Sequence, residues 1–241
     1  MERKKYFLTL IGITFILFIG TASNKSKVYK AYISNDMPSW KIVIDEMNRQ
    51  PAKSNEFRLE LLNYQYGYIA WCIGNKQKKQ AENYLELGQK NIEFLEKLSY
   101  KPSVINSYKS AFYGFSIGLN VLKAPFIGPK SVECAKLAIT QDASNPMGYI
   151  QYGNSQYYMP PLFGGSKSVA LSYFLKAEQL MEKKHDQVKE NWNYLSLLTI
   201  IAKAHTELNE KAKAKACYSK ILKIEPEFLW VKNELYPEII K

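Results

Sequence analysis

Residues 146–183 read as a helix, a tight corner rich in glycine and proline, and a second helix. The segment before it repeats the same plan. A helical hairpin of this size cannot bury its apolar faces alone, so copies of it must stack against one another. The sequence therefore predicts an all-α fold of stacked antiparallel helix pairs, an α-solenoid, with about four pairs and a capping helix at each end.

Apolar residues recur at steps of three and four along each expected pair. The four pairs begin near residues 54, 103, 146 and 189. Residues 24–37 are polar and are expected to form a leader, followed by one helix that ends near Pro51. A last helix over residues 227–240 offers an apolar covering face. The predicted organisation is a leader and N-terminal cap over 24–53, a repeat domain over 54–226, and a C-terminal cap over 227–241.

The first 23 residues have the layout of a secretory signal peptide. A short basic head precedes an apolar core at residues 7–19, and small residues follow where a peptidase would cut. The apolar run is short for a membrane span, which needs about 20 residues. The alternative is an uncleaved anchor, and membrane association is expected only in that case. Both readings place the folded body outside the cytoplasm, in the periplasm or cell envelope.

The chain is basic, with a net charge of +11, and 46% of its residues are apolar. The lysines are spread along the whole chain, as on the solvated faces of amphipathic helices. Together with export, this spread disfavours nucleic acid as a partner. Three scattered cysteines, Cys72, Cys134 and Cys217, favour buried free thiols over a disulfide framework.

Three Tyr-Gly pairs, at residues 66–67, 113–114 and 152–153, recur at one position of the expected first helices, and Ala202 takes the glycine position in the last pair. Small and aromatic residues follow in the second helices, as with Ala170 and Phe174. This pattern resembles the tetratricopeptide repeat family, which has W-x2-L-G-x2-Y, then A-x3-F, then P. The resemblance covers nearly all of residues 54–226. It implies that the glycine admits a close crossing by the second helix.

The spacing departs from that family. The glycine positions lie 47, 39 and 49 residues apart, against the family's repeat of about 34. Longer helices and corners must absorb the excess, so a regular superhelix with the usual peptide groove is not expected. The corners at residues 125–132 and 161–169 also resemble each other. Such a corner followed by an amphipathic helix resembles the periplasmic T-components of tripartite ATP-independent transporters, which are tetratricopeptide-like and hold small ligands.

A candidate binding surface follows from this repeat pattern. On first helices of such repeats, the residues three before, one after and four after the glycine position face the concave side. Here these positions also include the small or polar residues Ala111, Gly118, Thr199 and Thr206 and the apolar residue Ile150. The predicted partner-binding residues are Tyr64, Tyr68, Trp71, Tyr108, Phe115, Asn154, Tyr157 and Lys203. Large amphipathic rings suit an extended peptide or a ring-bearing solute. The alternative is that the aromatic stripe belongs to the core.

No catalytic or metal-binding arrangement is recognisable in the sequence. His185 lies in a polar linker and His205 takes a packing position, while residues 164–168, Gly-Gly-Ser-Lys-Ser, fit a structural corner better than a phosphate loop. We therefore expect a non-enzymatic protein without a cofactor. The first hypothesis is an exported scaffold that binds a protein or peptide through its concave face. The alternative is a small-ligand-binding or transport accessory protein.

Overall fold

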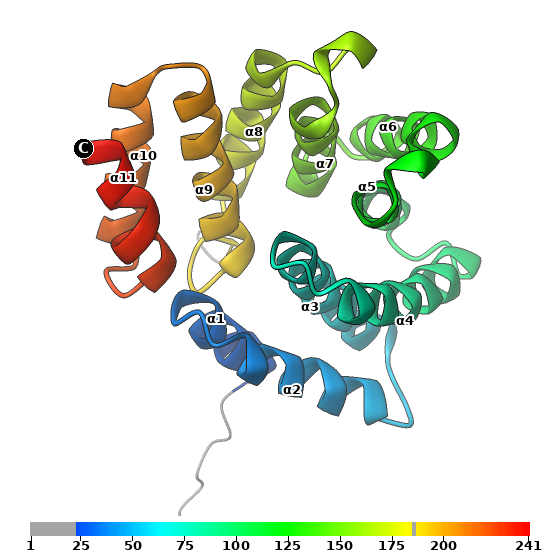
Figure 1. The fold of residues 1–241 in the computed structure, drawn as a ribbon. Coiled ribbons are helices and arrows are strands. Elements are labelled where there is room, and N and C mark those ends of the chain that lie inside the picture. Colours follow the sequence, from blue (N-terminus) through cyan, green and yellow to red (C-terminus); the bar gives the residue numbers. More distant parts are fainter. Residues whose placement is uncertain (1–22, 185–186) are drawn as a thin grey trace, which may run out of the picture.

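The computed structural model describes residues 23–184 and 187–241, and this part of the chain is helical without strands. The predicted all-α fold of consecutive antiparallel pairs is confirmed, with five pairs instead of about four (Figure 1). The pairs are α1 (Asn24–Ile33) with α2 (Met37–Arg49), α3 (Asn55–Gly74) with α4 (Lys78–Lys97), α5 (Pro102–Leu119) with α6 (Ala124–Gln141), α7 (Pro146–Tyr158) with α8 (Lys167–Glu182), and α9 (Trp192–Glu207) with α10 (Lys211–Ile224).

The fifth pair corrects one prediction. Residues 24–37 are not a leader, because α1 is a helix capped by Ser23, whose side chain accepts a hydrogen bond from the backbone N–H of Ser26. Val28 and Ala31 of α1 are buried against the rest of the fold. The helix has only ten residues, so its apolar spacing is too short to be recognised in the sequence. Its stability comes from packing.

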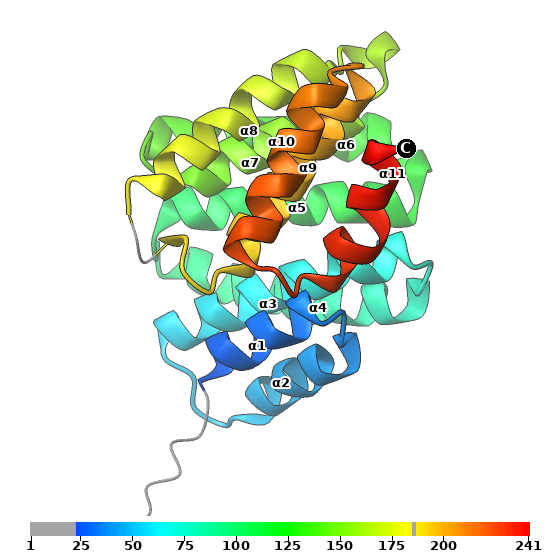
Figure 2. The ribbon, with the colours of Figure 1, turned by 90° about the vertical axis from the view of Figure 1, so that its left-hand side faces the viewer.

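The row of pairs curls round until its beginning touches its end. Helix α1 contacts α9, so the first helices of the later pairs, α3, α5, α7 and α9, lie on the inside of an almost closed ring (Figure 1). Figure 2 shows the same helices from the side, with α1 and α2 below α3 and α4. At the junction the ring centroid of Tyr32 lies 5.9 Å from that of Trp192 and 4.9 Å from that of Phe228. These aromatic contacts join the two ends.

The glycines of the three Tyr-Gly pairs do not share one role, which corrects the sequence interpretation. A Cβ atom at Gly153 would lie 2.5 Å from Phe174 of α8, so this glycine does admit the second helix of its own pair. A Cβ atom at Gly67 would instead lie 2.6 Å from Trp192 and 2.7 Å from Trp40, on α9 and α2. At Gly114 a Cβ atom would meet nothing within 4 Å in the described part of the chain. Helix α3 is therefore rotated about its own axis, so that Gly67 faces α2 and α9 and not its pair partner α4.

The two similar corner sequences also fold differently. In the α7–α8 corner, Gly164 has a φ of 93°, and a Cβ atom at Gly165 would lie 1.8 Å from the carbonyl oxygen of Met159. Residues 125–129 were expected to form the equivalent corner, but they lie inside α6. The chain turns earlier, at Asn120, whose side chain caps the short 3₁₀ helix Val121–Lys123. The sequence at residues 125–132 has no counterpart of Gly165, the second glycine that the sharp reversal before α8 requires.

The C-terminal cap is helical, as predicted, but its geometry changes along its length. A π-helical turn over Val231–Leu235 leads into α11 (Tyr236–Ile240), and Phe228 and Val231 are buried against the array. The signal-peptide prediction and His185 lie outside the described residues. Among the helices of residues 23–184 and 187–241, none combines the length and apolar character that crossing a membrane requires.

Candidate ligand-binding site

A pocket of about 430 Å³ lies where the inner helices begin. It is bordered by the first turns of α3, α5, α7 and α9 and by the end of α8, so it occupies one mouth of the ring. Its walls combine apolar side chains with amides. The lining residues are Glu56, Leu59, Glu60, Asn63, Lys101, Val104, Tyr108, Asn145, Pro146, Met147, Ile150, Met181, Gln187, Asn191 and Asn193. We call it the Asn63 pocket.

Helix caps fix the polar part of the Asn63 pocket. Asn145 precedes α7, and its side-chain oxygen accepts a hydrogen bond of 3.0 Å from the N–H of Met147. Its amide nitrogen donates to the hydroxyls of Ser103 at 2.9 Å and Ser107 at 3.2 Å, on α5. Asn191 caps α9 in the same way, accepting from the N–H of Asn193 at 3.0 Å. These asparagines thus position the starts of α7 and α9 around the pocket.

Asn63 joins three inner helices at the floor of the pocket. Its side-chain oxygen accepts hydrogen bonds of 3.1 Å from the hydroxyl of Tyr108 on α5 and from the amide nitrogen of Asn193 on α9. Burial raises the pKa of the Tyr108 hydroxyl well above its usual value. This phenol therefore stays neutral and acts as a donor. The floor is a fixed network of uncharged groups.

Aromatic rings fill the concave face below this floor. The ring of Tyr66 on α3 lies 5.9 Å from Tyr108, 5.5 Å from Phe115 and 6.0 Å from Trp192, measured between centroids. The amide nitrogen of Gln151 on α7 donates a hydrogen bond of 3.1 Å to the Tyr66 hydroxyl. Side chains from all four inner helices thus meet at Tyr66. The centre of the concave face is packed and is not an open groove.

Three of the predicted binding residues, Tyr108, Phe115 and Asn154, belong to this inner face, and a fourth, Lys203, lies against the C-terminal cap. Tyr108 and Phe115 contact Tyr66 directly. The amide nitrogen of Asn154 donates to the side-chain oxygen of Gln151 at 3.2 Å. Lys203 lies further along α9, with its amino group 4.4 Å from the centroid of the Trp230 ring, and desolvation lowers its pKa. Of the four, only Tyr108 reaches the Asn63 pocket.

The other four predicted residues lie in the packing between helices. Tyr64 and Tyr68 are 3% and 2% exposed, with hydroxyls that donate to Glu60 and Gln80. Trp71 stacks on Tyr68, with centroids 5.6 Å apart, and Tyr157 is buried with its hydroxyl on Glu207. The rotation of α3 explains the first three of these positions: Gly67 faces α2 and α9, which turns Leu59, Asn63 and Tyr66 inward in their place.

Sequence reasoning missed Asn63, Tyr66, Gln151 and Asn193, which hold the inner helices together. Tyr66 stands in the first Tyr-Gly pair, where it was read as space-filling beside the glycine. The asparagines carried a usable signal, since Asn145 and Asn191 precede helices where capping residues are preferred. Nothing local in the sequence shows that the caps of α7 and α9 would border one pocket with α3.

The rim of the Asn63 pocket carries both signs of charge, from Glu56, Glu60 and Lys101. Within the described residues, no group of three His, Cys, Asp or Glu side chains is placed to hold a metal ion. Burial raises the pKa of the Cys72 thiol to about 11, so this thiol is protonated at neutral pH. The pocket's own chemistry is apolar contact and hydrogen bonding by neutral groups.

The fold and pocket define a class: an all-α array of helix pairs, curled into a ring with a hollow at the mouth of the inner helices. No family model and no curated protein match the sequence. A solved structure does match this fold, the HusA haemophore from Porphyromonas gingivalis, with a TM-score of 0.62. The two chains are 18% identical, and the match covers 78% of this chain and 96% of that one. At this identity the likeness shows the fold alone, and the tetratricopeptide and T-component resemblances stay predictions.

Proposed function

We propose that the protein is an exported, non-enzymatic carrier that holds a small ring-bearing solute in the Asn63 pocket. The observation that carries the proposal is this pocket of about 430 Å³ at the mouth of a ring whose concave face is packed. Sites for small molecules are typically hollows of about 300–1,000 Å³, mostly apolar with a few fixed polar groups. The packed centre favours the small-ligand hypothesis over an extended peptide along the inner helices.

Haem is the first solute to test, because the structural neighbour is a haemophore. The lining of the pocket supports this choice in two ways. Met147 and Met181 offer thioether groups, which occur as haem ligands in other proteins. Lys101 on the rim offers a positive charge to a carboxylate. Metal-free protoporphyrin, which has the same ring and carboxylates, shows whether the iron contributes to binding.

The experiment is an absorbance titration of the full chain with haem and with protoporphyrin. Val104 lines the pocket from the first turn of α5, so Val104→Trp fills it and should weaken binding about tenfold or more. Leu119→Trp is the matched control, because Leu119 lies near the other end of α5 and lines a separate outer groove. It should bind as the unmodified chain does.

Two outcomes would contradict the proposal. If Val104→Trp and Leu119→Trp bind the solute equally well, the ligand lies elsewhere. If neither haem, protoporphyrin nor a panel of smaller aromatic solutes binds the unmodified chain, the small-ligand function fails and the protein-binding hypothesis gains. A circular dichroism spectrum of each variant confirms that the helices are intact.

A further inference from the structure

The corners at one end of the array expose apolar side chains to an unusual degree. The large hydrophobic side chains that are more than 70% exposed in the described part of the chain all belong to the α5–α6 and α7–α8 corners. Those that project are Val121, Leu122, Phe126, Leu162 and Phe163, and Leu162 reaches 88%. Tyr158, the last residue of α7, has an exposed ring, but burial near Tyr66 raises the pKa of its hydroxyl, so it does not count among the projecting tips. Exposed apolar side chains gathered in this way mark interaction sites.

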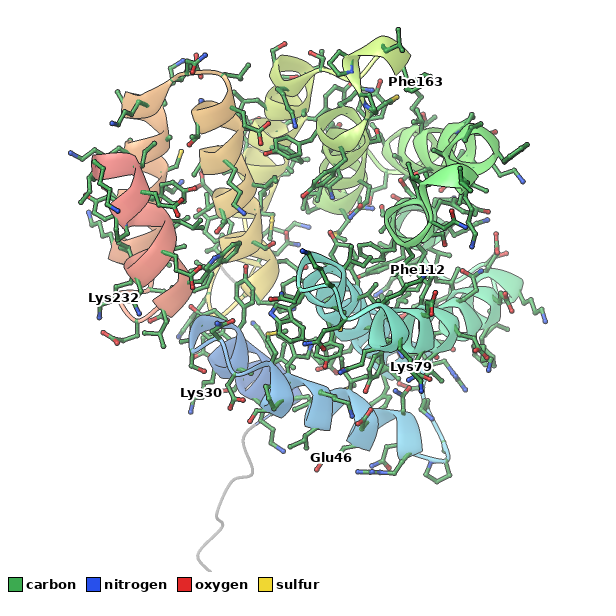
Figure 3. The ribbon with its side chains drawn as sticks, in the orientation of Figure 1. Lys30, Glu46, Lys79, Phe112, Phe163 and Lys232 are labelled. Atoms are coloured by element: carbon green, nitrogen blue, oxygen red, sulfur yellow. The ribbon has the colours of Figure 1, made fainter. Side chains whose placement is uncertain are left out.

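The two corners face the same side because of the topology. Each joins the first helix of a pair to the second, and the two pairs are neighbours in the array (Figure 2). Figure 3 shows Phe163 at the outer tip of the α7–α8 corner, whereas Phe112 lies inside, against α4. The corner side chains therefore project from the body, while core phenylalanines pack within it.

Positive charge surrounds these tips. The four turns between first and second helices from α3 to α10, residues 75–79, 119–130, 158–168 and 208–213, contain eight lysines, Lys76, Lys123 and Lys211 among them. They contain one acidic residue, Glu210, which pairs with Lys213 at 2.8 Å and with His205 at 2.5 Å. Two further lysines pair with acidic residues beside the turns, Lys167 with Glu207 at 2.8 Å and Lys78 with Glu82 at 3.8 Å. The other five lysines have no ion-pair partner among the described residues. This end of the array therefore presents projecting apolar tips set among lysines.

We infer that this end of the array docks on an anionic lipid bilayer, with both corners inserted at the headgroup level. Separate apolar tips suit a deformable layer, and the surrounding lysines complement anionic headgroups. The methylene groups of a lysine side chain can lie against the acyl chains while its amino group stays in water at the headgroup level. This association belongs to the folded body and is distinct from anchoring by residues 1–23. It stands independently of the solute proposed for the Asn63 pocket.

The test places its readout at the corner, because the apolar run at residues 7–19 has its own affinity for lipid. Phe163→Trp is compared with the unmodified chain on vesicles of phosphatidylcholine with phosphatidylglycerol. Subtracting the tryptophan fluorescence of the unmodified chain leaves the emission of the new Trp at position 163. On the vesicles this emission should shift to shorter wavelength, and brominated lipid should quench it. Leu98→Trp, at the opposite end of the pairs, is the matched control and should do neither.

A second measurement uses the double variant Leu162→Ser with Phe163→Ser, which alters exposed side chains only. Its partition onto the anionic vesicles should fall about tenfold relative to the unmodified chain, and salt should weaken the binding of both. An unshifted difference spectrum for Phe163→Trp, or equal partition of the double variant, would overturn the inference. Self-association without lipid that the double variant abolishes would also overturn it, in favour of a second copy of the chain.

Discussion

The side-chain amide of Gln151 on α7 donates a hydrogen bond of 3.1 Å to the hydroxyl of Tyr66 on α3, across 85 positions of sequence. Gln151 is 3% exposed, so water cannot replace a lost partner. Tyr66→Phe removes the hydroxyl and leaves a buried donor unpaired. We expect the free energy of unfolding to fall by about 1–3 kcal/mol, measured by equilibrium unfolding in urea.

Tyr100→Phe is the control for that variant, because the Tyr100 hydroxyl bonds to Glu56 at the exposed surface. It should change the free energy of unfolding by no more than about 0.5 kcal/mol. Equal effects of the two variants would show that the contact between α3 and α7 does not contribute specifically to stability.

The glycines of the Tyr-Gly pairs should respond oppositely to one added methyl group. Gly67→Ala forces a Cβ atom against Trp40 and Trp192, which should destabilise the fold by about 1–3 kcal/mol. Gly114→Ala meets nothing within 4 Å inside a helix, so it should stabilise by about 0.5–1 kcal/mol. Thermal unfolding of both variants checks the pair. A higher melting temperature for Gly67→Ala would contradict the close packing at α3.

The two buried tryptophans beside Gly67 differ in their hydrogen bonding. The indole N–H of Trp40 donates to the backbone carbonyl of Tyr64 at 3.2 Å, whereas the buried indole N–H of Trp192 has no partner among the described residues. Trp40→Phe should therefore cost about 1–3 kcal/mol more in unfolding free energy than Trp192→Phe. Chemical denaturation of both variants measures the difference. Equal losses would mean that the stabilisation by these tryptophans comes from the volume of the ring and not from the hydrogen bond of Trp40.

Stability should depend on pH through Glu207. Burial raises the pKa of this carboxyl, but hydrogen bonds from Lys167 and Tyr157 outweigh it and hold the pKa below its usual value of 4.5. A lowered carboxyl pKa stabilises the folded state above the usual value, and this contribution is lost as the pH falls through the folded pKa. The stability advantage over Glu207→Gln should therefore be largest near neutral pH and vanish in acid.

The control for Glu207→Gln is Glu86→Gln. Glu86 is also paired, with Lys90 at 2.7 Å, but both side chains are exposed. Solvent screens such a pair, so its contribution to stability near neutral pH should be smaller than that of Glu207. If unfolding midpoints for Glu207→Gln follow the unmodified chain across the whole pH range, the Lys167–Glu207 pair does not act as described.

Long helices were predictable because their own spacing carries the signal. In α4 the apolar residues at steps of three and four are Ala81, Leu85, Gly88, Ile92 and Leu95, and all are buried except Leu85, which is half-buried. Helix α1 was not predictable, since its burial depends on α9 and on the C-terminal cap, which are distant in sequence. The turn after α3 shows the same limit. Its left-handed residue is Lys76, with a φ of 58°, although the neighbouring Gly74 and Asn75 are residue types that tolerate this conformation better.

Some residues of the candidate site were likewise predictable from the spacing of their own helix, and others were not. The helical period located Phe115 of α5 beside Tyr66, and Asn154 of α7 beside Gln151, on the inner face. On α3 the rotation is set by Trp40 and Trp192, which press on Gly67 from other pairs. That contact is tertiary, so the inward positions of Asn63 and Tyr66 could not be derived from the sequence around them.

The contact between the first and ninth helices has a consequence for biosynthesis. The hydroxyl of Tyr29 bonds to Glu225, 196 residues downstream, at 2.9 Å. A nascent chain therefore emerges with Val28 and Tyr32 lacking their final neighbours until nearly all of the polypeptide has been made. Helix pairs can assemble one after another as they appear, but the earliest segment reaches its native environment among the last. During that interval its apolar side chains stay exposed to solvent, which favours aggregation over folding unless synthesis is completed.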